Sequence, residues 1–358
     1  TAGFHLSSLY TPVGWRSWRE IAAAWESAID KTTGSASAIK TFKNTELGET
    51  WVEEGEAPDW QQLLERREDY RIGSVPRGGL LLVGGADVQK DRIEVSVWAF
   101  GRGKTAWLVE HRVLMGDTAR DAGWTQLRAL LAETWTHAGG AQLPLARFAI
   151  DTGFATQAVY AFVRASRDPR VMAIKGAARG AALIGTPTAV DVTVACKKLR
   201  RGVKVYTVVV GIAKQELYQH LRLHADVAED GLTPVYPAGY LHLPKIDAEF
   251  LQQLCAEQLI TRRDRSGYAV REWQKLRERN EALDCYVYAR AAAAAAGLDR
   301  FEDRHWRELE RSLGIARTND PPPIATTTGP EEATDNGGLS TSARPNRRRV
   351  IKSRWLHR

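Results

Sequence analysis

The first part of the chain has its apolar residues at helical spacing among many polar ones. Residues 18–28 follow this pattern, and residues 60–70 form a charged amphipathic segment. Such spacing places apolar side chains on one face of a helix. We therefore expect residues 1–75 to form a helical segment that precedes the main folded part.

From residue 80 the pattern changes to that of strands. Residues 80–88, 92–100 and 105–113 predict three successive strands. The middle one alternates apolar with other side chains, starting with Ile93 and Glu94. The connections between the three are short, which favours an antiparallel meander.

Strands and helices then alternate along the chain. The pattern predicts a helix at 122–135, a strand at 146–151, a helix at 156–166 and a strand at 171–175. Alternation of this kind adds parallel strands to a sheet. Later segments predict a strand at 203–210, helices at 213–223, 247–258 and 282–296, and a hairpin at 260–273 that turns at 264–267. The predicted fold class is α/β, with a mixed sheet flanked by helices.

Composition supports a globular chain. Its 358 residues are 44% hydrophobic, which is enough for a large core. The apolar runs are shorter than the ~20 residues that span a bilayer, and no signal-peptide pattern opens the sequence, so we expect no membrane partner. Cys196, Cys255 and Cys285 lack a C-x-x-C spacing and are expected to be free thiols in a reducing cytoplasm.

The net charge of +7 is concentrated at one end. Seven basic residues and no acid lie within residues 339–358. The rest of the chain is balanced, so the net charge alone does not show that the folded part binds nucleic acid. Residues 314–358 are rich in Pro, Thr and Gly, and we expect a flexible basic arm that binds DNA or another protein.

Two aspartates stand at the ends of predicted strands. Asp87 lies in G-G-A-D-V-Q and Asp151 in F-A-I-D-T-G. Catalytic groups and ligands gather at strand ends, although a single acid there is also typical of a turn or a helix N-cap. Glu281 and Asp284 lie at the start of the helix predicted at 282–296, where acids also favour the helix dipole.

Taken together, these acids predict a metal site. Mg²⁺ or Mn²⁺ prefers oxygen ligands, and two ions roughly 3.5 to 4 Å apart can activate water and stabilise the leaving oxygen of a phosphodiester. In this hypothesis Asp87 bridges both ions, Asp151 and Asp284 each complete one, and Glu281 supports them. None of the eight histidines lies in a zinc-like pattern.

Five segments carry a resemblance to a known family. They are L-Y-T-P-V-G-W (9–15), T-F-K-N-T-E-L-G-E-T-W (41–51), V-P-R-G-G-L-L-L-V-G-G-A-D-V-Q-K-D-R-I-E (75–94), A-I-D-T-G (149–153) and R-N-E-A-L-D-C-Y-V-Y-A (279–289). In this order, within residues 4–297, the chain resembles the large terminase subunit of lambda-like tailed phages. The resemblance places Asp87, Asp151 and Asp284 on the family's metal-binding acids.

The resemblance also implies a fold and a function. Residues 76–300 would be an endonuclease domain of ribonuclease H-like fold, and residues 1–75 the linker that follows a missing packaging ATPase. Such a domain cleaves concatemeric double-stranded viral DNA in the cytoplasm of the infected bacterial host. Its partners would be the small terminase subunit and, through the C-terminal region, the portal protein.

Two other functions are alternatives to this interpretation. A resolvase or transposase-like nuclease uses the same fold, and a non-catalytic docking module for the portal would leave the acids structural.

Gly103-Lys104-Thr105 resembles the end of a phosphate-binding loop. However, Trp98 replaces the first glycine and the motif lies in a predicted hairpin, so no ATPase activity is assigned to this part.

DNA contacts are predicted from two basic segments. They contain Arg262, Arg263, Arg265 and Arg271 in the hairpin, and Lys175, Arg179, Lys197, Lys198, Arg200 and Arg201 before it. These side chains would contact phosphates without reading sequence, or would simply form a solvated charged face. A separate aromatic set, Trp15, Trp18 and Trp25, is expected to lie in a core or an interdomain seam.

Overall fold

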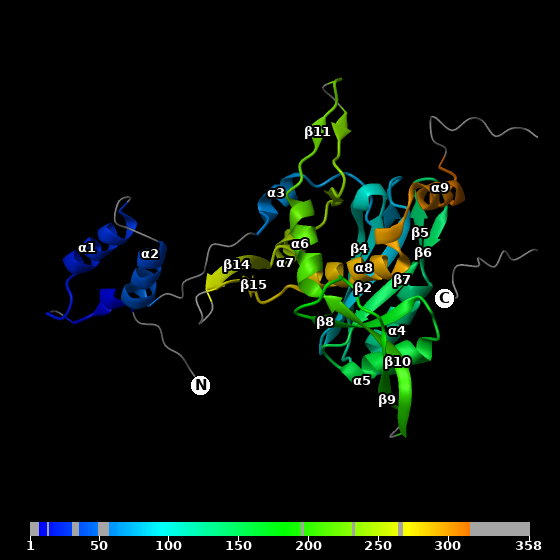
Figure 1. Ribbon diagram of the computed structural model, residues 1–358, viewed down its shortest axis with the longest axis horizontal. Helices are drawn as coiled ribbons and strands as arrows, with labels where there is room; N and C mark the ends of the chain where they lie inside the picture. Colours follow the sequence, from blue (N-terminus) through cyan, green and yellow to red (C-terminus); the bar gives the residue numbers. More distant parts are fainter. Residues whose placement is uncertain are drawn as a thin grey trace, which may run out of the picture. The chain divides into compact units, whose positions relative to one another are not determined.

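The structure is a computed structural model that describes residues 7–12, 14–30, 36–48, 57–194, 197–230, 233–263 and 268–315 (Figure 1). The predicted basic arm after residue 315, the hairpin turn at 264–267 and Cys196 lie outside the described residues. Cys255 and Cys285 are buried free thiols, as predicted. Among the described residues, no helix combines the length and apolarity that a membrane crossing requires.

The main sheet has eight strands in the order β13-β4-β3-β2-β7-β8-β10-β9. Its first part is the predicted meander of β2 (Leu81–Val88), β3 (Arg92–Phe100) and β4 (Ala106–Met115). These strands pair antiparallel, with a register shift between Val97 and Trp98. The meander prediction is therefore confirmed.

The parallel part of the sheet is also confirmed. It consists of β7 (Arg147–Asp151), β8 (Val171–Ala177) and β10 (Lys197–Val209). β2 pairs parallel with β7, β7 with β8, and β8 with β10. Helix α4 (Asp121–Ala132) comes before β7, and α5 (Thr156–Ser166) connects β7 to β8. This strand order, three antiparallel strands followed by parallel ones, is the predicted ribonuclease H-like arrangement.

Seven of the described strands were not predicted, and some helices are shorter than expected. β9 (Thr188–Val194) pairs antiparallel with β10 at one edge, and β13 (Leu241–His242) pairs with β4 at the other. The predicted helix 122–135 ends at Ala132, because Thr134–His137 forms β5. β5 lies between β1 (Ser74–Val75) and β6 (Gln142–Pro144) in a small separate sheet.

Helix α8 (Glu281–Ala296) packs on the main sheet (Figure 1). The first half of its alanine run, Ala291 to Ala293, is buried, and small side chains allow the helix to lie close to the strands. At Gly85 of β2, an added Cβ would lie 2.2 Å from the carbonyl oxygen of Cys285 and 2.5 Å from the backbone nitrogen of Ala289. A glycine within a strand often marks such a close backbone approach. Gly297, with φ +104°, ends the helix in the left-handed conformation.

The other predicted helices, the hairpin and several short elements are also present. The predicted helices and hairpin are present as α6 (Val210–Leu221), α7 (Ala248–Leu254), β14 (Glu257–Arg263) and β15 (Ala269–Lys275). Shorter elements are β11 (Asp226–Val227), β12 (Pro234–Val235), α9 (Asp303–Ser312) and the 3-10 turns Ser8–Tyr10, Arg102–Lys104 and Leu298–Arg300.

The N-terminal region is helical, as predicted. It contains α1 (Trp18–Ile29), α2 (Ala36–Phe42), a π-helical turn Lys43–Leu47 and α3 (Trp60–Glu65). Of the two alternatives for Trp15 and Trp18, a core is wrong within the described residues, since their side chains are 82% and 72% exposed, and an interdomain seam stays a prediction. The buried positions of α1 are Ile21 and Ala28 instead. Trp25 is partly buried and its ring lies 5.2 Å from that of Phe42.

Candidate active site

Asp87 and Asp151 lie at the ends of two neighbouring strands. Ala86 of β2 pairs with Ile150 of β7, so the two aspartates are the next residues in a parallel register. Adjacent strands are about 4.8 Å apart, and paired residues point to the same face of the sheet. Asp87 therefore shares its face with Gly85, two residues earlier, which is the face that α8 covers. The two carboxylates leave the sheet side by side, beneath α8.

Asp284 reaches the same place from the first turn of α8. The amide of Asn280 donates a hydrogen bond to its carboxylate at 3.0 Å. The charges of Asp284 and Asp151 both raise the pKa of Asp87, and all three aspartates raise the pKa of Tyr288 after the larger effect of burial. The structure thus places the three predicted aspartates in one electrostatic environment.

Burial makes these carboxylates unusually weak acids. It raises the pKa of Asp87 to about 7 and that of Asp284 to about 6, and it also raises the pKa of Asp151. Two hydrogen bonds oppose this effect, from the Gln89 amide to Asp87 at 2.6 Å and from the Gly153 N–H to Asp151 at 2.8 Å. Buried like charges without a counter-ion are costly, so the site favours either protons or cations.

The donor set fits a hard divalent cation, because it consists of carboxylate oxygens. The carboxylates do not converge fully, however. Among the described residues, no three His, Cys, Asp or Glu side chains are grouped closely enough to hold a metal ion as they stand. Binding a cation would require these side chains to turn toward one another.

A buried ion pair beside Asp284 was not predicted. Lys214 of α6 is 6% exposed, and its Nζ lies 2.6 Å from Glu257 Oε1 and 3.7 Å from Asp284 Oδ1. The Asn280 amide donates to Glu257 as well, at 3.1 Å. One signal exists in the sequence: Lys214 falls at helical spacing with the buried Leu217. Its partners could not be identified that way.

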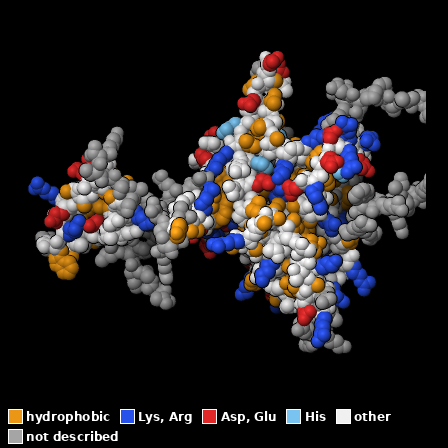
Figure 2. Space-filling model, viewed as in Figure 1, with side chains coloured by type: hydrophobic (Ala, Val, Ile, Leu, Met, Phe, Trp, Pro, Cys, Tyr) orange, Lys and Arg blue, Asp and Glu red, His pale blue; other side chains and the backbone are white. Residues whose placement is uncertain are grey.

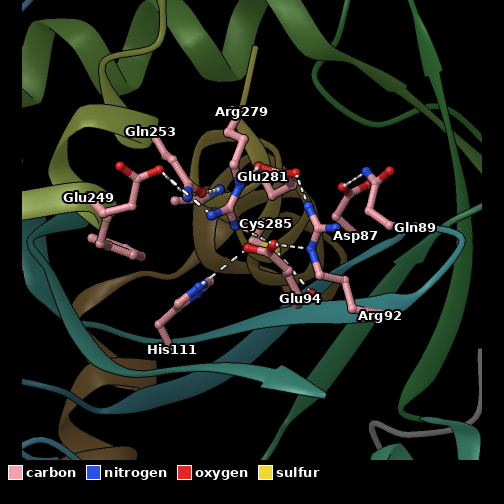
Figure 3. A network of polar contacts seen from close by, with 12 residues as sticks. Asp87, Gln89, Arg92, Glu94, His111, Glu249, Gln253, Arg279, Glu281 and Cys285 are labelled. Carbon is pink, nitrogen blue, oxygen red and sulfur yellow. Dashed lines mark hydrogen bonds and ion pairs between the residues drawn. The ribbon is translucent and has the colours of Figure 1, made fainter. Parts of the chain in front are cut away.

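Glu281 belongs to a cluster of charged residues that joins α8 to β3 (Figure 3). Its Oε1 accepts from Arg92 at 2.6 Å, and Arg92 and Arg279 both donate to Glu94, at 2.7 and 2.8 Å. Burial alone would raise the pKa of Glu94, yet hydrogen bonds from His111 and Arg92 lower it to about 2. Glu281 is thus engaged by an arginine, and its part in metal binding stays a prediction.

The predicted DNA-binding side chains are only partly described. Lys175 is exposed at β8, and Arg262 and Arg271 are exposed on the hairpin, where Arg262 pairs with Glu272 at 2.7 Å. The side chains of Lys197, Lys198, Arg201 and Arg263, and all of Arg265, lie outside the described residues. On the face in Figure 2, Lys and Arg side chains form several separate groups. DNA binding by these residues stays a prediction.

The segment Gly103-Lys104-Thr105, which resembles the end of a phosphate-binding loop, has a structural role. Gly103 and Lys104 form the turn between β3 and β4, as the sequence predicts. The ammonium group of Lys104 pairs with Glu216 at 3.1 Å and with Asp299 at 3.2 Å. This lysine is bound to carboxylates of the chain itself and precedes a strand rather than a helix.

Comparisons with known proteins give a consistent result. The family profile described as "Terminase large subunit gpA, endonuclease domain" matches residues 1–306. The terminase large subunit of Escherichia phage lambda is 32% identical over 296 residues, and that of Enterobacteria phage P21 is 32% identical over 292 residues. Each match covers 81% of this chain and 43% of the relative, so the chain spans less than half the length of either protein.

Solved structures give a more distant match. One is the large terminase nuclease from thermophilic phage G20c with bound magnesium. It is 15% identical, with a TM-score of 0.31, and the match covers 62% of this chain and 83% of that one.

Proposed function

Because the chain belongs to the endonuclease-domain family of terminase large subunits, we propose that Asp87, Asp151 and Asp284 hold the metal ions with which it cuts DNA. The observation that supports this most is their common position where α8 packs on the sheet. Two of them end adjacent parallel strands and the third begins the covering helix. They come from distant parts of the sequence, and turn or capping roles would not require them to share a site.

Each aspartate has a distinct role in this proposal. Asp87 would be shared by two Mg²⁺ or Mn²⁺ ions, and Asp151 and Asp284 would each hold one of them. When bound, such a pair of ions supplies an activated water and stabilises the leaving oxygen of the phosphodiester. Asn280 and Lys214 orient Asp284, through a hydrogen bond at 3.0 Å and a charge at 3.7 Å.

The substrate and the partners follow from the family rather than from the site. We propose that the intact protein cuts concatemeric double-stranded viral DNA in the cytoplasm of the infected bacterial host. The small terminase subunit would direct it to the cut site, and the C-terminal region would contact the portal protein. These roles concern the whole terminase large subunit, of which the match covers 43%.

A plasmid assay tests the catalytic proposal. Conversion of supercoiled plasmid to nicked and linear forms is followed in Mg²⁺, in Mn²⁺ and in EDTA. We expect cutting that requires metal, that is lost in Asp151→Asn and that persists in Asp226→Asn, a control at an exposed aspartate of β11. Equal cutting by wild type and Asp151→Asn, with both folded, would remove Asp151 from the site.

The same assay separates the other functions. Preference for a four-way junction over plain duplex would support a resolvase. Absence of cutting with either metal, combined with portal binding that survives loss of all three aspartates, would support a docking module.

A further inference from the structure

A groove of about 320 Å³ lies where the end of β8, the start of α6 and the hairpin β14–β15 meet. Its chemically distinctive lining residues are Arg179, Gly211, Gln215, Arg271 and Trp273. None of the described residues that line it is acidic. The groove therefore offers cationic and amide donors beside one large aromatic ring.

The two arginines come from the two basic segments that the sequence predicts to contact DNA. Arg179 follows β8 and Arg271 lies on β15, yet both line this one groove. A guanidinium group presents a planar set of donors that matches the oxygens of a phosphate. Two such groups in a groove without acids favour an anionic ligand.

Trp273 provides a surface for a flat ligand. Its ring is partly buried and packs edge-on against Tyr218, with centroids 5.2 Å apart. A Cβ at Gly211 would lie 3.4 Å from the indole Nε1, so the glycine leaves that edge open to the groove. Aromatic side chains of this kind contact nucleobases with little regard to sequence.

The groove adjoins the three aspartates. Gly211 lies three residues before Lys214 on α6, which is about one helical turn. The Lys214 ammonium is 3.7 Å from Asp284. Beneath the Trp273 ring, the Tyr218 hydroxyl donates to the carbonyl of Glu257, the residue that pairs with Lys214. A DNA strand cut at the aspartates would therefore pass close to the groove.

We propose that this groove holds a single unpaired nucleotide of the strand next to the cut, a role that rests on the proposed nuclease function. Arg179 and Arg271 bind its phosphate, and Trp273 contacts its base. The volume is near the lower end of roughly 300 to 1,000 Å³ for small-ligand pockets, which suits one nucleotide rather than a base pair. The domain thus selects duplex that is locally open beside the cleavage position.

Binding of two matched DNA molecules in EDTA tests this role without cutting. One is a fully paired duplex of 20 base pairs, and the other has the same sequence with two unpaired nucleotides in its centre. We expect fluorescence anisotropy to show roughly tenfold tighter binding of the opened duplex, the size of one base–aromatic contact. Equal affinity of the wild type for the two DNA molecules overturns the proposal.

Matched variants locate the effect. Arg271→Gln and Trp273→Leu should each lose most of the preference, because Trp273→Leu keeps an apolar contact with Tyr218 but offers no aromatic ring to a base. Arg262→Gln removes an exposed arginine of the same hairpin that does not line the groove, so it should retain the preference even if all affinities fall equally. A preference that survives both groove variants overturns the assignment to this groove.

A second readout does not depend on affinity. With 2-aminopurine at an unpaired position, wild type should change the fluorescence of the probe severalfold, and Trp273→Leu should change it less. No change with the wild type overturns base contact. Because all these measurements are made in EDTA, a preference in a chain that never cuts would refute the nuclease proposal alone. Cutting without a preference would refute the groove alone.

Discussion

Replacing Gly85 by alanine tests whether the contact between β2 and α8 sets the geometry of the site. The new Cβ would lie 2.2 Å from the carbonyl oxygen of Cys285, whereas ordinary van der Waals contact begins near 3.4 Å. The atoms it meets are helix backbone, which cannot rotate away. The strand and the helix must therefore separate by about 1 Å, and Asp284 moves with the helix away from Asp87.

The size of both effects follows from this displacement. Overpacking of a core costs about 1–3 kcal/mol, so the melting temperature should fall by several degrees. Misplacement of a catalytic group by 1 Å can cost about 100-fold in rate. We therefore expect metal-dependent plasmid cutting by Gly85→Ala to fall by about two orders of magnitude, more than its loss of stability explains at a temperature where it remains folded.

A matched glycine provides the control. Gly123 lies in helix α4, and a Cβ there would come no closer than 3.6 Å to Ile93. Gly123→Ala should leave cutting unchanged and stabilise the fold by about 0.5–1 kcal/mol, as alanine does in helices. The reasoning is refuted if Gly85→Ala cuts at the wild-type rate, because α8 would then not fix the distance between the acids.

Three further predictions concern single groups. The Asp87 pKa rises from 3.8 in the unfolded chain to about 7 in the folded one, so the free energy of unfolding in EDTA should decrease as pH rises between these values. Asp87→Asn should therefore be more stable than wild type at pH 8 and not at pH 4. Urea denaturation at both pH values measures the two free energies of unfolding, and a variant that is less stable than wild type at pH 8 would contradict this prediction. Lys214→Met leaves Glu257 buried without its partner and should cost about 3–5 kcal/mol, most of which the double variant with Glu257→Gln should recover. Glu281→Gln should reduce cutting less than Asp284→Asn does, because Arg92 already binds its carboxylate; equal losses would identify Glu281 as a metal ligand.

Local patterns account for most of the sheet. The alternation in residues 92–100 predicts β3 with its observed bounds, because it has the two-residue period of a strand. The helix predicted to reach residue 135 ends earlier, because tertiary contacts stabilise a strand there instead. Trp135 continues the helical spacing of Leu127 and Leu131, but its indole donates to Glu110 at 3.0 Å and its backbone pairs in the small sheet. β13 is only two residues long and gives no pattern to detect.

Local patterns likewise identify some residues of the site and not others. Asp87 and Asp151 were identifiable because an acid at the end of an apolar strand is a local signal. The pairing of Lys214 with Glu257 depends on how α6 meets β14, which no local pattern contains. Likewise, the sequence shows Arg179 and Arg271 as members of two separate basic segments, and only the packing of the hairpin places them in one groove.

The position of α8 also bears on when the nuclease can first act. Asp284 lies on the helix that packs directly over β2, far along the chain from the strands that carry Asp87 and Asp151. During synthesis, the sheet can begin to form while this helix is still within the ribosome, because domains fold as the chain emerges. If all three aspartates are required, a nascent or truncated chain that lacks α8 is harmless to DNA. Activity would begin only after the last large element of the core has docked.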